Sequence, residues 1–138
     1  ILLMNTDQIA AIITTHFPAV QGVYLFGSEA VGEAGPHSDV DIAVLLPHAE
    51  AKEVGDLSAS PCWLALTEAL KREVDLVNAR TVSTVFQKEI IQGQLLYCGD
   101  RLAVDEFEMY TLSFYQKLNE ERAGILEDFA RTGRAYPV

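Results

Sequence analysis

The sequence has 138 residues, of which 49% are hydrophobic and 22% are charged, as is typical of one globular domain with a buried core. Its 20 acidic and 10 basic side chains give a net charge of −10, which disfavours a long nucleic acid as substrate because negative charge opposes extended contact with a phosphate backbone. No apolar run reaches the roughly 18–20 residues of a membrane-spanning helix, and the two cysteines lie far apart, so we expect a cytoplasmic protein with reduced thiols.

Apolar spacing and turn residues divide the chain into alternating helices and strands. Thr6 is predicted to cap the first helix, and Ser60 followed by Pro61 signals the start of another. In chain order, the pattern predicts a helix over about 7–16, strands over 22–26 and 40–46, a loop over 48–58, a helix over about 61–72, a strand over 73–79, a helix over 82–92 and a strand over 94–98.

The last part of the chain has a different character. From Arg101 onward apolar residues recur every three or four positions and no proline occurs before Pro137, so a long C-terminal helix is predicted, with a weak point at Gly124. The sequence therefore predicts a single α/β domain, divided into a core over 7–100 and a C-terminal helical region over 101–135.

Two carboxylates interrupt the apolar segment YLFGSEAVGEAGPHSDVDIAVLL, residues 24–46. Side chains alternate across a strand, so Asp39 and Asp41 are predicted to share one face. Their like charges repel unless a cation compensates them, and carboxylates that leave positions open for water and phosphate suit Mg²⁺. The sequence therefore predicts a magnesium site on this strand.

The residues around this strand predict the rest of a phosphate-handling site. Gly27 and Ser28 end the preceding strand, where backbone N–H groups and a hydroxyl can hold phosphate oxygens. Asp75, on the predicted strand 73–79, can lie beside Asp39 and Asp41 on one sheet face. Three acids around two metal ions can stabilise the entering and leaving oxygens of a phosphoryl transfer, while one acid helps deprotonate the incoming hydroxyl.

Gly27-Ser28, ten spacer residues, Asp39-x-Asp41 and a third strand residue, Asp75, together resemble the signature of the DNA-polymerase-β-like nucleotidyltransferases. The segments VDLVNA and IIQGQLLYCGD look like the minimal nucleotidyltransferases that act as antitoxins to HEPN-domain ribonuclease toxins. One departure is Val31, where many members have arginine.

The resemblance implies a small mixed sheet of about four strands flanked by helices. It implies ATP as substrate, two Mg²⁺ ions held by Asp39, Asp41 and Asp75, and phosphates held by Gly27 and Ser28. The implied activity is transfer of AMP to a tyrosine of a HEPN toxin partner, with Asp75 assisting deprotonation.

Two alternatives remain open on the sequence. An aminoglycoside-type nucleotidyltransferase uses the same motif and would suit an acidic cleft, but such enzymes usually carry a further helical domain for which this chain is too short. A non-catalytic antitoxin would inhibit its partner by binding alone, with a vestigial acidic site. The intact set of three acids disfavours that reading, whereas Val31 mildly favours it.

Overall fold

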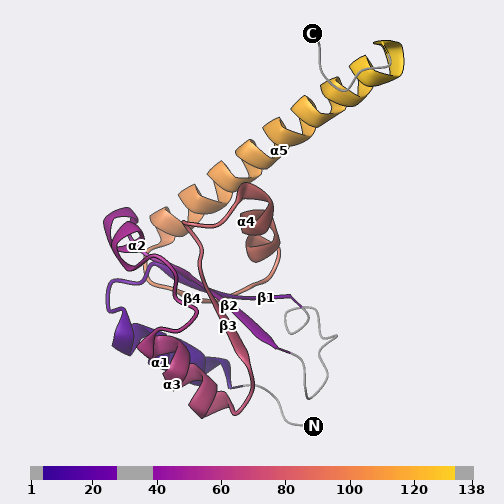
Figure 1. Cartoon of the computed structure of the whole chain (residues 1–138). Helices are drawn as coiled ribbons and strands as arrows, with labels where there is room; N and C mark the ends of the chain where they lie inside the picture. The colour runs from indigo at the N-terminus through magenta and orange to yellow at the C-terminus, as the bar shows by residue number, and fades with distance from the viewer. Residues whose placement is uncertain (1–4, 28–38, 133–138) are drawn as a thin grey trace.

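The computed structural model describes residues 5–27 and 39–132, which form a four-stranded mixed sheet with helices on both faces (Figure 1). The strand order is β3-β2-β1-β4, in which β2 and β3 are parallel and the other pairs are antiparallel. The elements are α1 (Thr6–His16), β1 (Gly22–Phe26), β2 (Val40–Leu45), α2 (His48–Val54), α3 (Pro61–Leu70), β3 (Val74–Asn78), α4 (Thr84–Ile91), β4 (Gln94–Cys98) and α5 (Arg101–Thr132). The predicted α/β fold with a long C-terminal helix is confirmed.

The sheet is buried on both faces, which explains why its strands are almost continuously apolar. Helices α1 and α3 cover one face, and α4 with the first turns of α5 covers the other (Figure 1). Alternate residues of one strand therefore belong to different cores. In β2, Ile42 and Val44 face α1 and α3, whereas Ala43 and Leu45 face α4 and α5. The remaining alternate residue of β2, Asp41, is its one incompletely buried position.

Two local predictions were wrong. Asn5, rather than Thr6, caps α1, because its side chain accepts a hydrogen bond from the Gln8 N–H at 3.1 Å. The segment predicted as a loop over 48–58 contains α2, which has no side-chain cap but is supported from outside the helix. Asn78 donates its side-chain N–H groups to the carbonyls of Ala51 and Gly55, each at 2.9 Å. A tertiary contact therefore stabilises a helix that local sequence did not predict.

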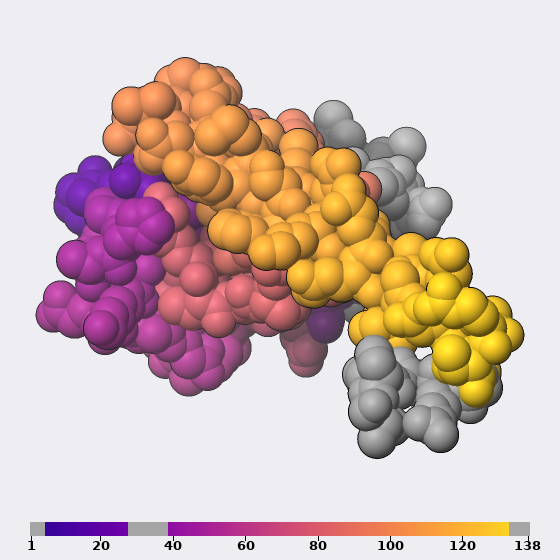
Figure 2. Space-filling model, turned by 90° about the horizontal axis from the view of Figure 1, so that it is seen from above, coloured from indigo at the N-terminus to yellow at the C-terminus, as the bar shows by residue number. Residues whose placement is uncertain are grey.

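Helix α5 extends well beyond the sheet (Figures 1 and 2). It continues through Gly124 without interruption, contrary to the predicted weak point, and its buried residues all lie in its first third. The helix also carries large apolar side chains that are exposed, among them Tyr110, Phe114, Leu118, Leu126 and Phe129. Within the described part of the chain, no helix combines the length and apolar character needed to cross a membrane.

The two cysteines differ in their surroundings, which leads to a chemical prediction. Cys62 in α3 is fully buried, and burial raises the pKa of its thiol to about 11, whereas Cys98 at the end of β4 is only half-buried. Because the thiolate is the reactive form, iodoacetamide at neutral pH is expected to alkylate Cys98 at least roughly tenfold faster than Cys62. Peptide mass mapping of the native protein measures both rates. Equal native rates would contradict the prediction, and equal rates in denaturant are the control.

Candidate active site

Asp41 and Asp75 lie directly opposite one another on the parallel strands β2 and β3. Each is the second residue of its strand, and both point to the sheet face that carries Ala43 and Val77, which is covered further along by α4 and α5. Asp75 is exposed and Asp41 is half-buried, so the pair lies at the open edge of the core. The structure thus brings together two of the three predicted acids through strand register alone.

Asp39 lies just before β2 and is not part of it, unlike the prediction from alternation. Pairing with β3 begins at Val40, whose N–H donates to the Glu73 carbonyl at 2.9 Å and whose register partner is Val74. Asp39 is exposed, yet its charge still acts on Asp41. Asp39 therefore contributes its negative charge to the site from the segment that leads into β2, not from the sheet itself.

The environment of Asp41 disfavours its charged form. Burial raises its pKa above the ordinary value, and the charges of Asp75, Asp39 and Glu89 raise it further, in that order. Glu89 belongs to α4 and was not a sequence candidate, because only the packing of α4 against the sheet brings it near β2. In the sequence, an acid on the helix that follows β3 is by itself only a weak indication of a site residue. The site thus concentrates negative charge that a bound cation would relieve.

Gly27, directly after β1, approaches the Asp41 carboxylate closely. Its φ of +71° lies in the left-handed region, and a Cβ at this position would lie 2.2 Å from Asp41 Oδ2. The register explains the approach, since Phe26 pairs with Asp41. Glycine is therefore required here both for the turn and for the space beside the carboxylate.

Two sequence features of this loop lie outside the described residues. Ser28, predicted to hold phosphate, and Val31, the departure from the family pattern, both fall within 28–38. The phosphate cradle of Gly27 and Ser28 therefore stays a prediction.

The donor set is chemically suited to Mg²⁺. Within the described ranges no group of three or more His, Cys, Asp or Glu side chains is gathered closely enough to hold a metal ion by itself. Mg²⁺ does not demand such a cage, because it is usually bound by one or two carboxylates together with waters and substrate phosphates. Asp41 and Asp75 meet that requirement, because they lie side by side on one face and the charge of Asp75 disfavours the charged form of Asp41.

The raised pKa of Asp41 predicts a gain in stability when its charge is removed. An acid whose pKa is raised by folding destabilises the native state above that pKa, and the effect disappears as pH falls below the ordinary value of 3.8. In metal-free buffer at pH 7, Asp41→Asn is expected to raise the melting temperature by roughly 1–4 °C, since solvent screening keeps the gain below about 1 kcal/mol. Thermal melting at pH 7 and at pH 3.5 checks this, and a gain undiminished at the lower pH would contradict it.

Comparison with known proteins identifies the family of this chain. The family described as "Polymerase beta, Nucleotidyltransferase" matches residues 7–102. Protein adenylyltransferase MntA of Shewanella oneidensis is 34% identical over 126 residues, which span 91% of this chain and 87% of that protein.

Solved structures show the same similarity. A chain in a crystal structure of a toxin–antitoxin complex with AMP-PNP is 32% identical, with a TM-score of 0.71 over 92% of this chain and 99% of that one. A chain in the complex of a tri-AMPylated Shewanella oneidensis HEPN toxin with its MNT antitoxin is 30% identical, with a TM-score of 0.63 over 91% of this chain and 95% of that one. The match to 7–102, together with 34% identity to MntA over nine-tenths of the sequence, places this chain in the polymerase β nucleotidyltransferase family.

Proposed function

We propose that this chain is an antitoxin protein adenylyltransferase, which transfers AMP from ATP to a tyrosine hydroxyl of a cognate HEPN ribonuclease toxin and so inactivates it. The observation that carries the proposal is the register pair Asp41 and Asp75 beside Gly27, on a chain whose sequence aligns along nine-tenths of its length with protein adenylyltransferase MntA. The complexes with AMP-PNP and with an AMPylated HEPN toxin support the same substrate and partner.

The reaction assigns a role to each acid. The tyrosine oxygen attacks the α-phosphorus of ATP, a new P–O bond forms, the bond from that phosphorus to the bridging oxygen breaks, and pyrophosphate leaves. All three acids, Asp39, Asp41 and Asp75, would hold Mg²⁺. Asp75, which is more exposed than Asp41, also accepts the hydroxyl proton. Mg²⁺, two ions in this proposal, supplies charge stabilisation for the entering and leaving oxygens.

A tyrosine acceptor needs this arrangement because its ordinary pKa is near 10, so at neutral pH the hydroxyl is mostly protonated. Gly27 keeps the space beside Asp41 free, so that the carboxylate can face substrate rather than a neighbouring side chain. Gly27 and Ser28 hold the β and γ phosphates in this proposal, which leaves the α-phosphorus next to the acids.

The deciding experiment separates covalent modification from inhibition by binding. The protein is incubated with ATP, Mg²⁺ and a purified HEPN toxin partner at one-tenth of the toxin concentration, and the toxin is then separated. We expect the toxin to gain the mass of one or more AMP groups on tyrosine and to stay inactive as a ribonuclease. The physical reason is that a covalent bond outlasts the contact, whereas inhibition by binding depends on concentration and vanishes on separation.

The same experiment distinguishes the alternatives. A toxin that regains full ribonuclease activity on separation, with no added mass, would replace the catalytic proposal by inhibition through binding. A parallel incubation with an aminoglycoside tests the other alternative, since transfer of AMP to the aminoglycoside but not to the toxin would replace the protein acceptor by a small molecule. The matched control omits ATP, so that any inhibition that remains measures binding alone.

A further inference from the structure

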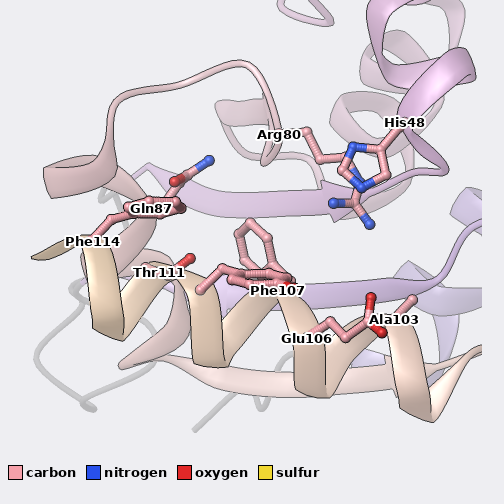
Figure 3. Close-up of a pocket in the computed structure, with 9 residues that line it drawn as sticks. His48, Arg80, Gln87, Ala103, Glu106, Phe107, Thr111 and Phe114 are labelled. Atoms are coloured by element: carbon pink, nitrogen blue, oxygen red, sulfur yellow. The ribbon is translucent and has the colours of Figure 1, made fainter.

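A cavity lies at the other end of the sheet from the acids. It has a volume of about 370 Å³, within the range of small-molecule sites. In Figure 3, Arg80 and His48 lie at one end of the cavity, Gln87 and Phe114 at the other, and Phe107 between them. The cavity is formed where α2, α4 and α5 meet the segment that follows β3.

This cavity is separate from the candidate active site. Asp75 is near the start of β3, whereas Arg80 lies in the turn after its end, and the three extended residue steps from Asp75 to Asn78 alone span about 10 Å. The neighbours of Arg80 agree, because it bonds to Leu46, just after β2, and to Gln21, just before β1. Asp41 lies near the start of β2 and pairs with Phe26 at the end of β1, so it is at the opposite end of each strand from these contacts.

Arg80 places a fixed positive charge in the cavity wall. Its Nε–H donates to the Leu46 carbonyl, and its Nη2–H donates to Gln21 Oε1 at 2.6 Å. The guanidinium also lies over the Phe107 ring, 5.9 Å from the centroid. These contacts hold the side chain in one position and leave other guanidinium N–H groups available for an anion. The carboxylate of Glu106, which lines the same cavity, acts electrostatically on this guanidinium, so a bound anion would share Arg80 with that carboxylate.

The opposite wall is aromatic and exposed. The rings of Tyr110 and Phe114 are stacked at 6.4 Å with an interplanar angle of 27°, and both side chains are more than half exposed, at 54% and 56%. These two rings offer flat apolar surfaces to a planar group, whereas Phe107 is only 6% exposed and lies beneath the Arg80 guanidinium. Glu106 and Gln87 add hydrogen-bonding groups to the same walls, of which Gln87 is fixed by donating to the Ala79 carbonyl at 2.9 Å.

We infer that this cavity binds a nucleoside monophosphate as a site distinct from the catalytic one. The phosphate pairs with Arg80, the base lies against the aromatic wall, and the ribose hydroxyls donate to Glu106. The combination of one fixed cation, flat apolar surfaces and an acceptor matches the three chemical parts of a mononucleotide, and the volume suits a ligand of that size. A nucleotide bound here would contact α4, which also carries Glu89 of the acidic site.

The test uses the full chain with its catalytic site disabled by Asp39→Asn and Asp41→Asn, in buffer without Mg²⁺, and AMP as the probe in isothermal titration calorimetry. We expect saturable binding of AMP, with adenosine at least about tenfold weaker because it lacks the group that pairs with Arg80. Arg80→Gln is expected to weaken AMP about tenfold and to leave adenosine unchanged. Equal affinities for AMP and adenosine, or no saturable binding, would overturn the inference.

A matched pair of variants keeps the test decisive if Arg80→Gln fails to fold. Phe114→Ala removes one aromatic wall and Phe129→Ala removes a similarly exposed phenylalanine, 50% against 56%, further along the same helix. Only Phe114→Ala is expected to weaken AMP, by about threefold to tenfold, since stacking on one ring contributes on the order of 1 kcal/mol. Equal effects of the two substitutions would contradict the assigned site.

Discussion

Replacing Asp39 and Asp41 together by asparagine is expected to lower AMP transfer by at least roughly 10³-fold while leaving the fold intact. The amide keeps the shape of each side chain but removes the charges that hold Mg²⁺ and stabilise the developing charge, and losing one preorganised electrostatic group alone typically costs about 10²–10³ in rate. The measurement is the rate of mass gain on the toxin, with the melting temperature of the metal-free variant recorded beside it.

The two readouts separate a chemical role from a structural one. Burial and the charge of Asp75 disfavour the charged carboxylate of Asp41 in the folded protein. Replacing it by a neutral amide is therefore expected to raise the melting temperature of the metal-free protein. Asp7→Asn, at an exposed position in the first turn of α1 on the other face of the sheet, is the matched control. It is expected to leave transfer unchanged and to lower the melting temperature slightly, because an acid near a helix N-terminus is mildly stabilising. A fall of many degrees in the double variant would mean that the acids support the fold, and retained transfer would remove them from the reaction.

The common sheet face of Asp41 and Asp75 was predictable, because side chains alternate along each strand. Val40, Ile42 and Val44 must all face α1 and α3, which fixes Asp41 on the opposite side. The same argument applied to Val74 and Leu76 fixes Asp75. Side-chain alternation therefore carries information about the face of the site, whereas the register of β2 against β3 does not follow from it, because both faces of β2 are buried.

Other features depend on contacts between distant segments and were not predictable. In the sequence Asp39 continues the alternating pattern, but pairing with β3 begins at Val40, so alternation does not apply to it. Helix α2 depends on Asn78, more than twenty residues away. Glu89 reaches the acidic site, and Arg80 reaches Gln21 and Leu46, only because helices and strands from different parts of the chain pack together.

Gly27→Ala is expected to reduce AMP transfer by about 10²-fold, although glycine has no side chain that could take part in the reaction. A Cβ at Gly27 would lie 2.2 Å from Asp41 Oδ2, so the carboxylate must turn away from its position beside Asp75. Displacing a catalytic group by about 1 Å can cost that factor. The left-handed φ of +71° adds strain of about 1 kcal/mol, which lowers the melting temperature by a few degrees.

Gly55→Ala is the control that separates the displaced carboxylate from backbone strain. Gly55 also has a positive φ, +58°, but a Cβ there meets nothing within 4 Å, and it ends α2 at the far side of the domain from the acids. Gly55→Ala is expected to lose at least as much stability, because its ψ of −126° together with the positive φ is a conformation open mainly to glycine. Even so, only Gly27→Ala is expected to lose transfer when rates are measured well below both melting temperatures. If Gly55→Ala lost transfer equally, general destabilisation would explain the effect. If neither lost it, the Asp41 carboxylate would have to tolerate movement, which is incompatible with its holding Mg²⁺ beside Asp75 in one fixed geometry.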